Sequence, residues 1–173
     1  MTEKEFLNRI AGNNTDILQQ FIDLLRKMEV PYCVIGGLAV NAYVEPVVSL
    51  DIDIVIAVHS VKKLNERIET FATLKKFTHS INIVFPGSDL RIQIQTDSRY
   101  QSFIDRAAIK NVLGYQMNVA AVEDVLKGKI WAYSDTQRRN SKRQKDLADI
   151  FRIVEAYSDL ITSLPDSIKQ MFT

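Results

Sequence analysis

The spacing of apolar and polar side chains divides the chain into helical and strand-like segments. In residues 16–28 the apolar side chains recur every three or four positions, which predicts a helix with one buried face that ends before Pro31. Residues 32–35 are a short, continuous apolar run, the pattern of a strand that is buried on both faces. Residues 52–58, which are continuously apolar from Ile54 to Val58, predict a second strand. The chain therefore begins with a helix and two core strands.

The remaining segments continue this alternation. Two runs, 81–85 and 90–95, flank a Pro-Gly-Ser-Asp link and predict a β-hairpin. Ser60 is expected to cap a helix over residues 61–73. The other expected elements are a helical arm over residues 2–10, a helix after Asp97 or Ser98, strand pieces around Gly114, and helices over 122–133, 142–157 and 165–172. A mixed sheet with helices packed on it, followed by further helices, predicts an α/β or α+β fold.

Length and charge are those of an ordinary globular chain. The 173 residues predict one domain, with an α/β core over residues 1–120 and the helices of residues 121–173 packed on it. The net charge of +1 gives no overall attraction to nucleic acid or membrane. No apolar run approaches the ~20 residues of a membrane span, and the N-terminal MTEKEF lacks the apolar core of a signal peptide. We therefore expect a cytoplasmic protein with no membrane partner. The single cysteine, Cys33, lies within an apolar run and is interpreted as a core residue.

Two aspartates stand at the start of the second apolar run. Asp51 and Asp53 are separated by one residue, and alternate residues of a strand point to the same face, about 6.6 Å apart along it. Two such carboxylates repel each other unless a cation lies between them. Mg²⁺ prefers oxygen ligands and is often held by one or two carboxylates together with substrate phosphates. The pair is therefore a candidate magnesium site, although Asp-x-Asp also occurs simply as the solvated entry to a strand.

Gly36 and Gly37 directly follow the first apolar run. One interpretation is a turn that needs a positive φ angle, which glycine adopts freely. The other is a close approach of the backbone to a phosphate, with the N-terminus of the following helix directed at the anion. Glycines that hold a triphosphate and aspartates that hold its bridging metal would form one site.

These two motifs resemble a known family signature. The order GGLAVNAY and then SLDIDIVI is similar to nucleotidyltransferase-fold proteins, in which a Gly-Gly or Gly-Ser turn and a short helix precede Asp-x-Asp and a hydrophobic run. A later segment, VEDVLKGKIWAYSDTQRRNSKRQKDLADI, resembles the lysine helix and basic linker of the AbiEii-type group, an abortive-infection and toxin–antitoxin branch. The resemblance covers roughly residues 15–157. It implies a nucleotidyltransferase-like mixed β-sheet flanked by helices, with a C-terminal helical segment.

The later segment adds three candidate site residues. Lys129 falls within the apolar stripe of its expected helix, where a lysine must either extend its stem toward solvent or meet an anion. The resemblance implies that Lys129 contacts the nucleotide, because family members use an equivalent lysine in this way. It also implies that Lys145 and Asp146, which match the family's Lys-Asp-Leu, line the active site. The helical pattern places Lys145, Asp149 and Arg152 opposite the apolar stripe of their helix, and without the resemblance Lys145 and Asp149 would be a solvated ion pair on that outer face.

One position departs from the family pattern. Many nucleotidyltransferase-fold enzymes carry a third carboxylate on a later strand, where this chain has LRIQIQT, with Gln93 or Gln95 in that place. A glutamine amide can ligate a metal weakly through its carbonyl but cannot accept a proton as a base. Either Asp146 supplies the missing carboxylate, or the site binds a nucleotide without efficient turnover.

Two functional hypotheses follow, and a third stays open. The first is a Mg²⁺-dependent nucleotidyltransferase that transfers a nucleoside monophosphate from an NTP to an acceptor hydroxyl. Its expected residues are Asp51 and Asp53 as metal ligands, Asp51, Asp53 and Asp146 as catalytic groups, and Gly36, Gly37, Lys129 and Lys145 for nucleotide binding. The resemblance implies tRNA or a protein as acceptor and a partner toxin or antitoxin protein, and RNA phosphates would meet the basic residues 138–145. The second hypothesis is a nucleotide-binding or antitoxin-type interaction module with little or no catalysis. The third is a structural α/β domain in which the Asp-x-Asp is incidental.

Overall fold

A seven-stranded mixed sheet with the strand order β3-β4-β5-β2-β1-β7-β6 forms the centre of the computed structural model, which describes residues 1–172. The strands are β1 (Tyr32–Ile35), β2 (Asp51–Ile56), β3 (Thr73–Lys76), β4 (Ser80–Val84), β5 (Arg91–Gln95), β6 (Ala108–Val112) and β7 (Tyr115–Val119). Strand β2 runs antiparallel to β1 and parallel to β5, and β1 runs parallel to β7. The predicted α/β (α+β) class with a mixed sheet is confirmed.

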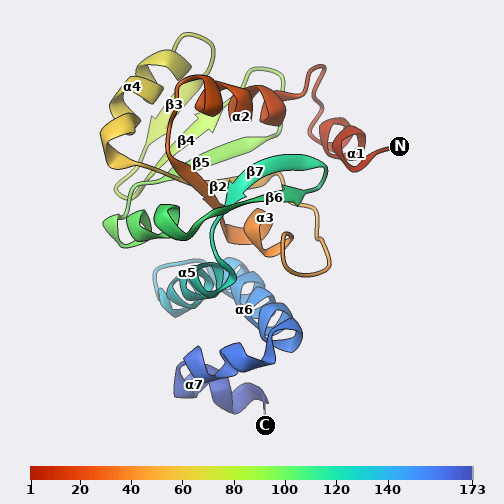
Figure 1. Cartoon of the computed structure of the whole chain (residues 1–173), viewed down its shortest axis with the longest axis vertical. Helices are drawn as coiled ribbons and strands as arrows, with labels where there is room; N and C mark the ends of the chain where they lie inside the picture. The colour runs from red at the N-terminus through yellow and green to blue at the C-terminus, as the bar shows by residue number, and fades with distance from the viewer. Residues whose placement is uncertain (173) are drawn as a thin grey trace.

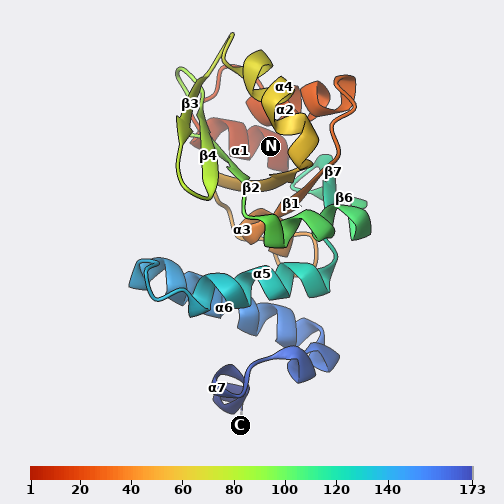
Figure 2. The ribbon, with the colours of Figure 1, turned by 90° about the vertical axis from the view of Figure 1, so that its left-hand side faces the viewer.

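Helices cover both faces of this sheet. They are α1 (Glu3–Ile10), α2 (Ile17–Lys27), α3 (Gly36–Val40), α4 (Val58–Ile68), α5 (Val122–Ser134), α6 (Asn140–Ala156) and α7 (Asp166–Lys169), with 3₁₀ segments η1 (Ser98–Arg106), η2 (Ser158–Ser163) and η3 (Gln170–Phe172). Helices α2 and α4 lie on one side of the sheet, whereas α3, α5 and α6 lie on the other, with α7 farthest from it (Figures 1 and 2). Helices α5 and α6 pack on each other and on α3. Within residues 1–172, no helix has both the length and the apolar composition needed to cross a membrane.

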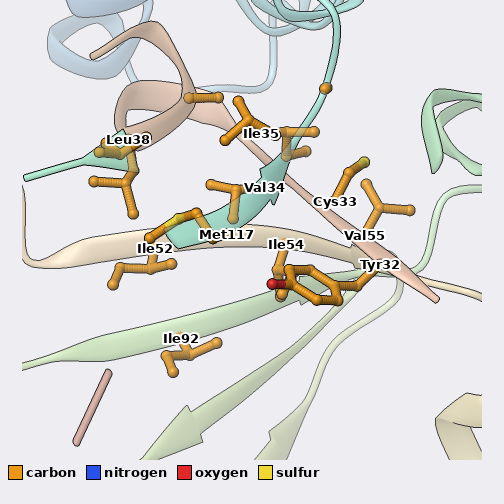
Figure 3. Packing of buried hydrophobic residues seen from close by; sticks show 14 of the residues in the cluster. Tyr32, Cys33, Val34, Ile35, Leu38, Ile52, Ile54, Val55, Ile92 and Met117 are labelled. Atoms are coloured by element: carbon orange, nitrogen blue, oxygen red, sulfur yellow. The ribbon is translucent and has the colours of Figure 1, made fainter. Parts of the chain in front are cut away.

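The two faces of β2 have different surroundings. Ile52 and Ile54 are each 2% exposed and join the main core, together with Ile92 of β5 and Val34 of β1 (Figure 3). The alternating residues Asp51 and Asp53 are half-buried on the opposite face. The core residues thus fix the register of β2 and direct both aspartates toward the side of α3 and α5.

Most predicted elements are present, with shifted boundaries. Strand β1, the hairpin of β4 and β5, the strands around Gly114 and the C-terminal helices are confirmed. Cys33 is fully buried, as interpreted. Asp97 accepts a hydrogen bond from the Arg99 backbone and caps η1, which is a 3₁₀ rather than an α-helix.

The prediction for residues 61–73 is wrong at both ends. Helix α4 begins at Val58, and Ser60 lies inside it rather than at its cap. The backbone N–H of Val58 donates to the side chain of Gln101, from a segment distant in sequence, so no local capping residue is required. The helix ends at Ile68, and residues 73–76 form the edge strand β3. This strand is mostly exposed and polar, so it lacks the apolar alternation that identifies a strand in sequence.

Candidate functional site

The two aspartates of β2 lie at the centre of the sheet, beside the turn that carries the glycine pair. Asp53 is in register with Ile35, the last residue of β1, so Gly36 follows directly next to it. Gly36 has a φ of +66°, and a Cβ atom there would overlap the carboxylate oxygen Oδ2 of Asp53. Gly37, in contrast, has open space where its Cβ would be. Position 36 therefore requires glycine for two reasons, a left-handed backbone and close contact with Asp53.

Burial makes Asp53 a poorly solvated carboxylate. It raises the pKa of Asp53 above its ordinary value, and the nearby Asp51 raises it further. Lys129, Arg138 and Lys142 act in the opposite direction, because their positive charges favour the ionised form. These three residues come from α5, α6 and the segment between them, so the fold brings the C-terminal helices to the aspartates of the sheet.

Lys129 is the central cation of this arrangement. It is 8% exposed, and its Nζ lies 3.0 Å from Oδ1 of Asp146 and 2.7 Å from Oδ2 of Asp149. Burial alone would lower the pKa of Lys129, but Asp149 and Asp146 reverse this effect and hold it above the ordinary value. The lysine is therefore charged, and its positive charge acts on Asp53 as well as on its two partners on α6.

A second set of contacts holds these partners in place. Oδ2 of Asp146 accepts a hydrogen bond from Nε of Arg138 at 2.7 Å, and Asp146 is only 2% exposed. Arg152 donates to Asp149 at 2.8 Å and to the backbone carbonyl of Glu45, in the segment that leads to β2. Both oxygens of Asp146 are occupied by cations, so in this structure it positions Lys129 and Arg138.

The sequence-predicted residues are thus only partly brought together. Gly36, Asp51, Asp53, Lys129 and Asp146 surround one region between the sheet and the helices α5 and α6. Lys145 is exposed on α6, and no ion pair of this residue is present among residues 1–172.

Three further residues of the site were misplaced or missed by the sequence reasoning. Asp149 and Arg152 were expected on the outer, solvated face of α6, yet their side chains are only 15% and 25% exposed. That expectation is wrong because α6 packs against both α5 and α3, and one apolar stripe does not describe a helix with two neighbours. No sequence pattern indicates Arg91 of β5, whose Nε lies 2.8 Å from Oδ1 of Asp51.

The residues next to the aspartates on β5 are now defined. The parallel pairing places Arg91 beside Asp51 and Gln93 beside Asp53, whereas Gln95 is beside Val55. Of the two glutamines, Gln93 is therefore the one that lies beside Asp53. The Gln95 side chain accepts a hydrogen bond from the backbone of Asp97.

The carboxylates of Asp51 and Asp53 fit one hard divalent cation whose remaining ligands come from a phosphate. No cluster of three or more His, Cys, Asp or Glu side chains suited to a metal exists among residues 1–172. Two carboxylates are nevertheless sufficient for Mg²⁺ when substrate phosphates supply further oxygens. The raised pKa of Asp53 also fits, because a cation at this carboxylate would compensate for its burial.

Comparisons with known proteins identify the fold. No family model matches the chain, and no curated protein sequence does so. Among solved structures, ANT(2″)-Ia in complex with adenylyl-2″-tobramycin is similar with a TM-score of 0.65 and 12% identity, over 91% of this chain and 97% of that one. The lincosamide antibiotic adenylyltransferase LnuA, with lincomycin bound, gives 0.55 and 14% over 79% and 95% of the two chains. An antigenic nucleotidyltransferase-like protein from Paracoccidioides brasiliensis gives 0.53 and 16% over 98% and 94%. The chain therefore has the nucleotidyltransferase fold, as the resemblance implied, while the AbiEii-type branch stays a prediction.

Proposed function

We propose that this protein is a Mg²⁺-dependent nucleotidyltransferase, which transfers a nucleoside monophosphate from an NTP to an acceptor hydroxyl. The observation that carries the proposal is the position of Asp53. This half-buried carboxylate with a raised pKa lies against the left-handed Gly36 and within the electrostatic influence of the buried Lys129. A carboxylate and an ammonium group that act on each other suit a bound metal and the phosphates that accompany it.

The chain's own residues account for binding and orientation in this proposal. Asp51 and Asp53 would hold Mg²⁺, which when bound neutralises charge on the triphosphate and on the transition state. Lys129 would contact a phosphate while Asp146 and Asp149 hold it in position. Gly36 allows the Asp53 carboxylate to lie against the backbone, where a larger residue would overlap it.

The reaction would be a displacement at the α-phosphorus. The acceptor oxygen forms a new P–O bond, the bond from the α-phosphorus to the bridging oxygen breaks, and pyrophosphate leaves with that electron pair. The acceptor proton goes to solvent, because the amide of Gln93 cannot take it and both oxygens of Asp146 already bind cations. Catalysis then rests on positioning and charge rather than on a strong general base.

We further propose that the chain divides by role and belongs to the AbiEii-type branch. Residues 1–120 carry Asp51, Asp53 and the glycine pair, and the helices after residue 120 carry Lys129 and the carboxylates that hold it. The Lys-Asp-Leu segment of α6 supports this branch, with tRNA or a protein as acceptor and a toxin or antitoxin as partner. Arg139, Lys142 and Lys145 are exposed along the start of α6, where phosphates of an RNA acceptor would reach them.

A second candidate function is a nucleotide-binding or antitoxin-type interaction module with little or no catalysis. Gln93 favours it, because this neutral amide occupies the position next to Asp53. Such a module would retain nucleotide and metal binding but would not transfer a nucleotide.

One experiment separates these functions. The protein is incubated with Mg²⁺, each α-labelled NTP and total tRNA, and label transfer to RNA or protein is measured together with thermal unfolding. Transfer that is lost in Asp53→Ala but kept in Asp105→Ala, an exposed aspartate of η1, supports the enzyme. Nucleotide-dependent stabilisation without transfer supports the binding module. If no NTP produces either effect, the hypothesis of a purely structural domain is supported.

A further inference from the structure

Strand β5 places a cation and an amide beside the aspartate pair of β2. Arg91 is in register with Asp51, and Gln93 is in register with Asp53. Side chains at paired positions of neighbouring strands point to the same face of the sheet, and neighbouring strands lie about 4.7–4.9 Å apart. The two β5 side chains therefore lie immediately beside the carboxylates that would hold a metal.

We propose that this site takes a single divalent cation, together with the nucleotide, and that Arg91 and Gln93 prevent a second cation from binding. The inference rests on the proposed function and deepens it, because it specifies the metal content of the same site. It makes Arg91 a built-in positive charge at the place where a second metal would be bound.

The contact of Arg91 supports this assignment. Its Nε lies 2.8 Å from Oδ1 of Asp51, so one oxygen of that carboxylate already has a positively charged partner. The Arg91 side chain is 62% exposed, which leaves the guanidinium free to follow the carboxylate when a metal binds. A second divalent ion on this flank would have to displace the guanidinium or lie next to it, and like charges at such distances repel.

Because position 93 is a glutamine, strand β5 supplies no carboxylate ligand for a second metal. Gln93 is half-buried beside Asp53, and it offers a neutral amide where a bridging carboxylate would be needed. Its other neighbour in the sheet, Asn82 of β4, is also an amide. Across residues 1–172 no third carboxylate joins Asp51 and Asp53 in a cluster suited to a metal. A second ion would therefore find no additional charge at this flank to offset its own.

The opposite wall of the site adds further positive charge. Lys129, Arg138 and Lys142 already act on Asp53, and the two nearby carboxylates on α6 are engaged by Lys129, Arg138 and Arg152. Each oxygen of Asp146 and Asp149 already has a cationic partner, so neither carboxylate offers a free oxygen to a second ion.

Metal stoichiometry tests the inference without any turnover. Mn²⁺ is titrated into the protein in the presence of each α,β-methylene nucleoside triphosphate, and bound Mn²⁺ is measured by equilibrium dialysis and electron paramagnetic resonance. We expect one bound Mn²⁺ per chain for the natural sequence and two for the double variant Arg91→Ala with Gln93→Glu. The matched control is Arg91→Ala with Gln95→Glu, which adds the same charge to the same strand but beside Val55, and it should bind one.

Each outcome decides. Two Mn²⁺ per chain in the natural sequence, with the dipolar coupling of a close pair, would overturn the inference while leaving the proposed function intact. A single Mn²⁺ in the Arg91→Ala, Gln93→Glu variant would overturn the role given to these two residues. No bound Mn²⁺ in the natural sequence with any nucleotide would refute the proposed function itself, and this inference with it. If the double variant does not fold, Gln93→Glu alone serves as the test, and it should bind a second Mn²⁺ at least about tenfold more tightly than the natural sequence.

Discussion

Replacing Gly36 by alanine tests the geometry on which the site depends. The new Cβ would be placed on a backbone with φ of +66° and would overlap Oδ2 of Asp53, with the Cβ and Cγ of that residue each 3.1 Å away. The left-handed conformation costs a non-glycine residue about 1–2 kcal/mol. Moving Asp53 off its rotamer costs about 0.5–1.5 kcal/mol more.

We therefore expect Gly36→Ala to lower the free energy of unfolding by about 2–3 kcal/mol, which for a chain of this length is a fall of about 5–10 °C in Tm. Nucleotide-dependent binding of Mg²⁺ should also weaken, because the displaced Asp53 carboxylate would no longer be directed at the metal position that it shares with Asp51. Urea unfolding and thermal unfolding measure the first effect. Calorimetric titration with a non-hydrolysable NTP and Mg²⁺ measures the second.

Two other glycines supply the controls. Gly12 has a φ of +67° but nothing within 4 Å of its would-be Cβ, so Gly12→Ala isolates the backbone cost. Gly37 has neither feature and lies in α3, so Gly37→Ala should be neutral or stabilising by up to about 1 kcal/mol. If Gly36→Ala costs no more than Gly12→Ala and leaves metal binding unchanged, the contact with Asp53 has no role and the reasoning is refuted.

Three further predictions concern buried polar groups. Because burial raises the pKa of Asp53, Asp53→Asn should stabilise the fold by about 0.5–2 kcal/mol at pH 7–8, and this gain should vanish in unfolding curves measured below about pH 4, where the unfolded carboxyl is also protonated. Lys129→Met should lower the free energy of unfolding by about 3 kcal/mol, since the buried Asp146 and Asp149 lose their shared cation; a loss under 1 kcal/mol would contradict the pairing. Burial raises the pKa of the Cys33 thiol to about 12, so it should react with a disulfide reagent at pH 8 only after unfolding in urea.

Sequence reasoning predicted the parts of this fold that depend on local pattern. The apolar run of β1, the apolar residues of β2 and the stripe of α2 follow directly from strand and helix periodicity. Because each element buries a contiguous set of side chains, its identity is encoded within its own residues. The start of α4 was not encoded in this way, since its backbone is satisfied by Gln101 from η1.

The site residues were likewise predictable where a local sequence pattern marks them, and not where distant segments meet. Asp53 and Gly36 stand in recognisable motifs, and Lys129 was conspicuous because a lysine interrupts an apolar stripe. Asp149 and Arg91 become neighbours of these residues only through the packing of α5 on α6 and of β5 beside β2. A signal for Asp149 did exist, since residues three apart on a helix share a face and Asp146 was already assigned to the site.

Metal and nucleotide should bind to this site cooperatively, and the charges show why. Mg²⁺ prefers six ligands, and Asp51 and Asp53 offer it only two carboxylates. The positive charge of Lys129 repels a cation that binds at Asp53 without a nucleotide. A triphosphate alone meets the aspartates as like charges, although Lys129 attracts it. When both bind, the phosphates complete the metal's ligands and the metal screens the aspartates, so each ligand removes the penalty of the other. We therefore expect millimolar Mg²⁺ alone to shift Tm by less than about 1 °C, and Mg²⁺ with its preferred NTP to raise it by more than the sum of the separate shifts. Asp53→Asn should abolish this excess while keeping a stable fold, and additive shifts in the natural sequence would show that the two ligands occupy unconnected sites.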